Sequence, residues 1–185
     1  MSAFEIFGSI FGFISIWLTV RASVWCWPTG IVNIVLLLVT YFEARLYGDV
    51  VNYLVMLALS IWGWIAWVRP TSSNTKRRIR YANARGRWLS FIGVAGGTPL
   101  MALLFIRYTD AAQPWWDSLV NALALVAQVL LALMLVENWV LWILSDVVAI
   151  GVYIAQKLYI VTALYISYTV FACWGLREWI VKARA

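Results

Sequence analysis

The sequence contains no histidine and little charge. Of its 185 residues, 12% are charged and 64% are hydrophobic, whereas about a quarter of the residues in an average soluble domain are charged. Without histidine, His-based metal sites and Ser/His/Asp or Cys/His catalysis are excluded. The two cysteines, Cys26 and Cys173, lie in apolar stretches, which favours packing over a disulfide or a metal pair. We therefore expect no enzymatic activity, no metal and no cofactor.

What the sequence has instead is long apolar runs, with a mean hydropathy of +0.86 and 13 tryptophans. A hydrocarbon core of about 30 Å requires roughly 20 apolar residues per helix. Seven runs approach or reach this length: 4–20, 25–42, 49–68, 88–106, 116–136, 138–155 and 159–180. The sequence therefore predicts an all-α integral membrane protein, with one transmembrane domain over residues 1–185.

The basic residues predict the orientation in the membrane. The polar stretch 69–87 holds seven of the fourteen Lys and Arg residues, and the positive-inside rule places it in the cytoplasm. Seven spans then put the N-terminus outside and the C-terminus inside. Orientation and contact with anionic lipid explain the net charge of +6, so we expect no nucleic-acid partner.

The chain also matches itself at an offset of 112 residues. Twelve identities fall in the 63 aligned positions that begin at residue 5, without a gap. They include Trp27 with Trp139, Tyr41 with Tyr153, Tyr53 with Tyr165, Trp62 with Trp174, Gly63 with Gly175, and Trp67 with Trp179. Such a match predicts a duplication.

The duplication sets the domain organisation. Residues 1–68 form a first repeat of three helices, 88–106 a linker helix, and 115–180 a second repeat of three helices. Because three is odd and one linker helix intervenes, this 3+1+3 arrangement gives both repeats the same orientation. Transporters built from such parallel repeats bind their substrate near the membrane midplane, between the repeats.

One predicted helix carries a polar and aromatic face. Trp139, Trp142 and Asp146 are spaced i, i+3 and i+7, so they share a side of the helix. A carboxylate inside a bilayer is costly and by default faces a cavity or a partner, and two indoles could stack on a flat or cationic ligand. The alternative is an interfacial tryptophan belt with Asp146 paired to a neighbouring helix.

Other polar and aromatic residues follow the same spacing. Candidate site residues are Asn121 and Gln128 on the fifth predicted helix, Asn33 on the second, and Tyr53, Ser60 and Tyr165, with Asn52, Tyr168 and Thr169 along the same path. Hydrogen bonding between helices explains each amide about as well as a site does. Two matched groups at predicted inner helix ends are expected to be interface anchors: Trp62, Gly63 and Trp67, and Trp174, Gly175 and Trp179.

The pattern of acids bears on the driving force. Glu5, Glu43, Asp49, Asp110 and Asp117 fall at predicted outer ends, so no second buried acid accompanies Asp146. This argues against a proton relay, and the absence of a Walker sequence excludes direct drive by ATP. Facilitated diffusion is the mechanism that we expect.

The segments ENWVLWILSD, KLYIVTALY, LYGDVVNYL and SIWGWIAW resemble the PnuC family of bacterial vitamin transporters over nearly the whole chain. The resemblance implies an inner-membrane facilitator with a 3+1+3 fold related to the SWEET sugar transporters, commonly a homotrimer. It implies transport of nicotinamide riboside, or a related small cationic vitamin, with uptake maintained by a cytoplasmic vitamin kinase. It also assigns Trp139 and Trp142 as the stacking pair.

Three positions depart from the nicotinamide riboside pattern of the family. Tyr53 stands where a glutamine is usual, Ser60 where an asparagine is usual, and Asp146 where some members have asparagine. Thiamine, carried by other members of the family, is therefore the alternative substrate. A sugar facilitator and a non-transporting membrane scaffold are alternatives of another class.

Overall fold

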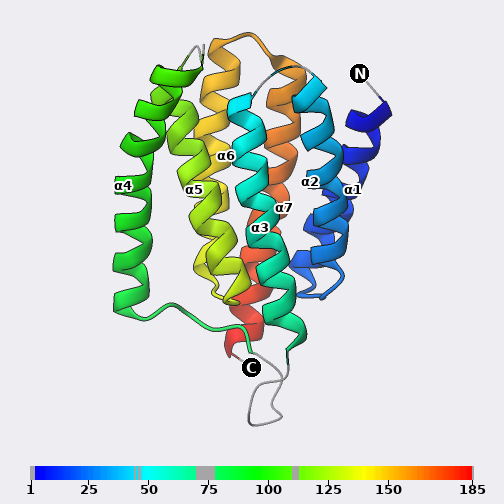
Figure 1. Cartoon of the computed structure of the whole chain (residues 1–185). Helices are drawn as coiled ribbons and strands as arrows, with labels where there is room; N and C mark the ends of the chain where they lie inside the picture. Colours follow the sequence, from blue (N-terminus) through cyan, green and yellow to red (C-terminus); the bar gives the residue numbers. More distant parts are fainter. Residues whose placement is uncertain (1–2, 44, 46, 70–77, 110–112, 185) are drawn as a thin grey trace.

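The computed structural model describes residues 3–43, 45, 47–69, 78–109 and 113–184 (Figure 1). The described chain is all-α, as predicted. Its seven helices are α1 (Ala3–Val20), α2 (Cys26–Glu43), α3 (Tyr47–Val68), α4 (Ala84–Tyr108), α5 (Pro114–Ala132), α6 (Glu137–Ala155) and α7 (Tyr159–Arg184). Six of them, α2 to α7, are long and apolar enough to cross a membrane, whereas the apolar part of α1 is the shorter segment Ile6–Val20.

Three helix boundaries differ by four residues from the predicted ones, and one of them is the end of α7, at Arg184 and not at residue 180. Helix α4 begins at Ala84 because Asn83 caps it, its Oδ1 accepting from the Gly86 amide at 2.8 Å. The last four residues of the predicted loop 69–87 are therefore helical. Helix α5 ends at Ala132, and not at residue 136, because Met134 adopts a φ of 56° that a helix cannot continue.

The turns between helices repeat along the chain. Four residues other than glycine have positive φ in the described chain, and they form two pairs 112 positions apart: Ala22 (57°) with Met134 (56°), and Arg45 (60°) with Lys157 (60°). The amide of Ser23 bonds to the Leu18 carbonyl at 2.9 Å, and that of Leu135 bonds to the Leu130 carbonyl at 3.0 Å. Helices α1 and α5 thus end in the same Schellman-type turn.

The helices form one bundle with the two termini at opposite ends (Figure 1). Sequential helices pack together within α1–α3 and within α5–α7, while the packing of α3 on α5 and of α1 on α7 joins these two halves. Helix α4 lies at one edge and packs chiefly against α5 (Figure 1). Its other sides expose large apolar residues such as Phe91, Leu100 and Leu103, as expected for contact with lipid.

Four buried tryptophans, here called the tryptophan cluster, close the bundle towards its C-terminal end. Trp27 meets Trp67 edge-on at 5.4 Å between ring centroids, Trp139 meets Trp179 edge-on at 5.7 Å, and Trp67 lies 6.4 Å from Trp179. The prediction that Trp67 and Trp179 are interface anchors is wrong, since they are only 8% and 0% exposed. The indole N–H groups of Trp67 and Trp179 find acceptors within the bundle, whereas those of Trp27 and Trp139 have no hydrogen-bond partner among the described residues.

Those acceptors belong to the opposite half of the chain. Trp67 Nε1 donates to the Ala132 carbonyl at the end of α5, at 3.1 Å, and Trp179 Nε1 donates to the Thr19 carbonyl near the end of α1, at 3.0 Å. The two halves are therefore hydrogen-bonded to each other reciprocally at this end of the bundle.

The segment before α4 is attached to the turn between α5 and α6. The amide of Arg80 donates to the Met134 carbonyl at 3.1 Å, and the amide of Val136 donates to the Arg80 carbonyl at 3.0 Å. Glu137 accepts from the Ala82 amide at 2.9 Å and pairs with Arg87 at 3.1 Å. Glu137 therefore has a structural role at the end of the bundle.

Candidate functional site

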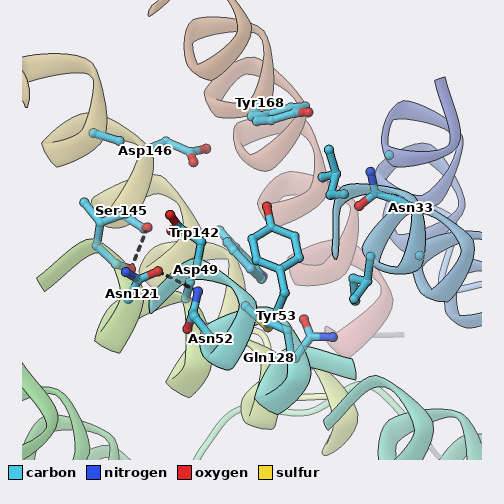
Figure 2. Close-up of a pocket in the computed structure, with 18 of the residues that line it drawn as sticks. Asn33, Asp49, Asn52, Tyr53, Asn121, Gln128, Trp142, Ser145, Asp146 and Tyr168 are labelled. Carbon is cyan, nitrogen blue, oxygen red and sulfur yellow. Dashed lines mark hydrogen bonds between the residues drawn. The ribbon is translucent and has the colours of Figure 1, made fainter. Parts of the chain in front are cut away.

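A cavity of about 740 Å³ lies between the two halves of the bundle (Figure 2). All seven helices contribute to its lining, α4 only by its last turn. It extends from the first turns of α3 and α5, at Asp49 and Asp117, to Trp27 and Trp139, whose partners Trp67 and Trp179 do not line it. Its volume is that of a pocket for a vitamin-sized molecule.

The structure brings together all but one of the residues that the sequence nominated for the site or the path. The nine that line this one cavity are Asn33, Tyr53, Ser60, Asn121, Gln128, Trp139, Trp142, Asp146 and Tyr165. Asn52 and Tyr168 also line it. Thr169 does not, and its hydroxyl donates to the Tyr165 carbonyl of its own helix at 2.9 Å. The i, i+7 spacing was informative because each helix turns one continuous face to the cavity.

Asp146 lies near the middle of α6 and is 5% exposed. Figure 2 shows its carboxylate directed into the cavity, on the side of Tyr168. In the described chain no side chain forms a hydrogen bond or an ion pair with this carboxylate. Among the described residues that line the cavity, the one basic residue is Arg45, in the turn after α2. A buried carboxylate without a protein partner is suited to a cationic or hydrogen-bond-donating ligand.

Two further acids share the cavity with Asp146, contrary to the prediction that it is alone. Asp49 and Asp117 are half-buried, in the first turns of α3 and α5. The sequence placed them at helix ends, where an acid is ordinary, but the cavity extends that far. Three acids against one arginine favour a cation in the cavity.

The two predicted stacking residues differ in how much of the ring is available. Trp139 is 3% exposed, and its ring lies against Gly175, where a Cβ atom would collide with it. Trp27 lies against Gly63 in the same way. Trp142 is only partly buried, so its ring offers more surface to a ligand than that of Trp139 does.

Some of the predicted polar residues already have hydrogen-bond partners. Asn33 Nδ2 donates to the Gly8 carbonyl at 2.7 Å, and Gln128 Nε2 donates to Ser60 Oγ at 3.0 Å. Ser60 Oγ in turn donates to the Met56 carbonyl at 2.8 Å. These bonds join α1 to α2 and α3 to α5, so these side chains support the bundle as well as lining the cavity.

Tyrosines form a layer on the side of the cavity away from the tryptophan cluster. Tyr41 and Tyr53 have ring centroids 4.9 Å apart, Tyr153 and Tyr165 5.2 Å, and Tyr165 and Tyr168 5.9 Å. The sequence singled out Tyr53 and Tyr165 for the site, and Tyr41 and Tyr153 only as members of the repeat. The four matched tyrosines thus meet in two equivalent pairs.

No group of three or more Cys, Asp and Glu side chains in the described ranges is placed to hold a metal ion. The chemistry of the cavity is that of binding: an aromatic ring, a carboxylate and amides around a space closed at one end by tryptophans.

Comparisons with known proteins agree with a transporter fold. The family model described as nicotinamide mononucleotide transporter matches residues 2–181. The riboflavin/roseoflavin transporter RibM of Streptomyces davaonensis is 30% identical over 97% of this chain and 85% of its own length. The nicotinamide riboside transporter PnuC of Escherichia coli is 29% identical over 100% of this chain and 87% of its own length.

A solved structure shares the fold. The crystal structure of the vitamin B3 transporter PnuC superposes with a TM-score of 0.79 over 98% of this chain and 82% of that one. The sequence identity in this superposition is 18%, so it bears on the fold alone.

Proposed function

The chain belongs to the nicotinamide mononucleotide transporter family, and from that premise we propose that it imports nicotinamide riboside by alternating-access facilitated diffusion. Its place is the inner membrane of a bacterial cell. Nicotinamide riboside is a flat cation with a carboxamide and a ribose, and a relative 29% identical to this chain is named for its transport.

The observation that carries this proposal is the carboxylate of Asp146, which has no partner among the described residues and lines the same cavity as Trp142. A pyridinium ring can stack on the partly buried indole of Trp142 while its positive charge lies near the carboxylate. The acids Asp49 and Asp117 add to the negative potential on the way in. A neutral sugar would not use the negative charge of these carboxylates.

Two other vitamins remain candidates for specific reasons. Thiamine is also a flat cation, and Asp146 suits its thiazolium or aminopyrimidine as well as it suits a pyridinium. Riboflavin is supported by the 30% identity to RibM. The three acids lining the cavity favour the two cations over riboflavin, which is uncharged.

A binding titration of the purified protein tests the substrate. Tryptophan fluorescence is followed with nicotinamide riboside, thiamine and riboflavin in parallel, for wild type and Trp142→Ala. We expect quenching by nicotinamide riboside that Trp142→Ala abolishes and that the control Trp116→Ala, at an exposed tryptophan away from the cavity, retains. Quenching by thiamine or riboflavin alone would identify that vitamin as the substrate in place of nicotinamide riboside. If none of the three vitamins quenches the fluorescence, the proposed vitamin site is wrong.

Measuring vitamin uptake into proteoliposomes distinguishes a transporter from a membrane scaffold. If the protein only organises the membrane, vesicles that contain it will take up vitamin no faster than empty vesicles. Asp146→Asn is expected to slow uptake while the protein remains folded.

For the architecture, we propose the 3+1+3 arrangement of parallel repeats, with α4 as the linker, related to that of the SWEET transporters. The matched positive-φ turns at Ala22 and Met134 support it, as do the matched packing of Trp27 on Gly63 and of Trp139 on Gly175. Rocking of one three-helix unit against the other would expose the cavity to each side in turn.

For the orientation, we propose that the N-terminus is outside and the C-terminus in the cytoplasm. The described arginines between α3 and α4, and Lys182 and Arg184 at the end of α7, lie on the side assigned to the cytoplasm and support it. Reporter fusions to each terminus, one active only outside and one only inside, test this. A cytoplasmic vitamin kinase would then maintain uptake by phosphorylating the substrate.

We also propose a homotrimer. The exposed apolar face of α4 supplies surface that a neighbouring copy or lipid can cover. Native mass spectrometry in detergent gives the number of copies directly, and a monomer there would overturn the proposal.

A further inference from the structure

Asn52 of α3 and Asn121 of α5 face each other across the two halves of the bundle. Asn52 Nδ2 donates to Asn121 Oδ1 at 2.8 Å, and both residues line the cavity. We propose, on the basis of the proposed vitamin transport, that this asparagine pair recognises the donor–acceptor edge of the vitamin, such as the carboxamide of nicotinamide or the amine and ring nitrogen of an aminopyrimidine.

The asparagine pair leaves part of its hydrogen-bonding capacity unused. An asparagine side chain has two N–H donors and an oxygen that accepts two bonds. The bond between the two residues uses one donor and one acceptor, so the pair retains an oxygen on Asn52 and an amide nitrogen on Asn121. These are one acceptor and one donor on neighbouring groups, which is the complement of a carboxamide edge.

Leaving the Asn52 oxygen without a hydrogen bond costs free energy. Asn52 is 9% exposed, and its Oδ1 is buried with no hydrogen-bond partner among the described residues. An unpaired buried acceptor costs free energy, so such atoms are rare in folded proteins and call for an explanation. A ligand N–H that meets this oxygen provides one.

The asparagine pair lies close to Asp146 in depth along the bundle. Ser145 Oγ donates to the Val120 carbonyl at 3.1 Å, so the residues that follow, Asp146 and Asn121, lie at about the same depth in the bundle. Figure 2 shows Asn52 and Asn121 grouped with Ser145 on one wall, with Asp146 on the same side of the cavity. One molecule can therefore place its charge near Asp146 and its polar edge near the asparagines.

The other side-chain hydrogen bond between α3 and α5, from Gln128 to Ser60, differs because the donor and the acceptor that it leaves unused both belong to Gln128. Gln128 donates to Ser60, and the hydroxyl of Ser60 already donates to the Met56 carbonyl. That link therefore has no free donor on the serine, and it acts as a brace between the helices. The asparagine pair also has no counterpart at the matching positions, where the sequence has Leu164 and Ser9.

The test is a binding titration with ligands that differ only at the edge. Nicotinamide riboside carries a carboxamide, and nicotinic acid riboside carries a carboxylate, which has acceptors and no donor. Thiamine and oxythiamine form a second pair, in which the amino group is replaced by an oxo group. Each ligand is titrated against wild type, Asn52→Leu and Asn121→Asp.

Asn52→Leu removes the acceptor, and Asn121→Asp keeps an oxygen for the Asn52 amide but removes the free donor. We expect each variant to bind the carboxamide ligand about tenfold more weakly, the effect of one lost hydrogen bond to a buried group. Binding of the carboxylate ligand should change by less than about threefold in Asn52→Leu. In Asn121→Asp it should weaken more than binding of the carboxamide ligand does, because the new carboxylate repels the carboxylate of the ligand. Ser167→Ala is the matched control, because Ser167 does not line the cavity and its hydroxyl bonds only to its own helix.

The outcomes separate this inference from the proposed function. If wild type binds none of the vitamins, the proposed function fails and the edge has nothing to recognise. If wild type binds and both variants weaken the two members of a ligand pair equally, the proposed function stands and the inference is wrong. Melting temperatures of the variants confirm that each is folded, and Asn121→Asp keeps the result decisive if Asn52→Leu does not fold.

Discussion

The helices α1–α3 and α5–α7 share a frame and differ in what they present to the cavity. By the frame we mean residues that pack helices together and are identical at positions 112 apart. Trp27 and Gly63 match Trp139 and Gly175, and the pair Tyr41 and Tyr53 matches the pair Tyr153 and Tyr165. Several of these aromatic residues also line the cavity, but its polar residues on α5 and α6 have no polar match: Asp146 corresponds to Ile34 and Gln128 to Ile16, while Trp142 corresponds to Gly30. The halves are alike in their aromatic packing and unlike in the charged and amide side chains that a ligand would meet.

That difference has a physical reason. A small molecule such as a vitamin has one charged end and one polar edge, so a site for it gains nothing from repeating the same carboxylate on both sides. Helix packing and movement, in contrast, profit when both halves are built alike. Four predictions test this separation, from the largest expected effect to the smallest.

The shared frame should fail equally on both sides. In Gly63→Ala and Gly175→Ala the added Cβ atom collides with the ring of Trp27 or Trp139. Overpacking of this kind costs about 3 kcal/mol, so we expect similar, large drops in melting temperature in detergent. Gly151→Ala is the control, since nothing lies within 4 Å of its Cβ position. A large drop in only one of the two variants would show that the frames are not equivalent.

The asymmetry of the cavity should depend on Asp146. In Asp146→Ile the residue becomes the one found at the matching position, Ile34, and the buried negative charge is lost. We expect a cationic vitamin to bind about thirtyfold more weakly, or about 2 kcal/mol. Calorimetric titration measures the change, and Val140→Leu, at a 42% exposed position on the same helix, serves as control. Unchanged affinity would remove Asp146 from the site.

The reciprocal bonds of Trp67 and Trp179 should hold one end of the cavity closed. Trp67→Phe and Trp179→Phe keep a ring and remove the N–H donor to the opposite half. Each lost bond is worth about 1 kcal/mol, so we expect about a fivefold higher opening probability.

The native Cys26 reports this opening, because it is buried and lines the cavity next to the tryptophan cluster. Cys173 is exposed, and not buried as the sequence suggested, so it is first replaced by alanine. The rate of labelling of Cys26 by an impermeant maleimide should rise in both variants. It should not rise in Trp62→Phe or Trp174→Phe, whose tryptophans are exposed; equal rates in all four would argue against the closure.

The smallest effect is expected at a contact present in one half only. Glu137→Gln breaks the ion pair with Arg87, whose side chain is 62% exposed, while its amide oxygen still accepts from the Ala82 amide. An exposed ion pair contributes about 0.5 kcal/mol. The melting temperature should fall slightly at low salt and match wild type at about 1 M salt, where surface charges are screened. A drop that persists at high salt would mean that the contact is not electrostatic.

Much of the site followed from helical spacing. Trp142 and Asp146 lie on one side of α6, and Asn121 and Gln128 on one side of α5, and all four line the cavity. Spacing cannot indicate which of these side chains is already bonded. Asn33 and Gln128 have partners on other helices, while Asp146 has none among the described residues.

The acids at helix starts show what helical spacing cannot predict. Asp49 and Asp117 follow a helix beginning, a position at which an acid is common for local reasons. Whether the cavity reaches them depends on the arrangement of the neighbouring helices, which no local pattern encodes. Trp67 and Trp179 were misplaced for the same reason, because the carbonyl groups that accept from their indole N–H groups lie on other helices.

The sequence by itself determined the membrane-spanning helices, the match between the halves, and the faces that carry Asp146 and the amides. These depend on hydropathy and on the 3.6-residue period, which are properties of one segment at a time. Only the tertiary structure decided that Asn52 meets Asn121, that Trp67 and Trp179 join the halves, and that three acids share one cavity. Such contacts depend on the rotation and depth of each helix relative to its neighbours, and these are set when all the helices pack together.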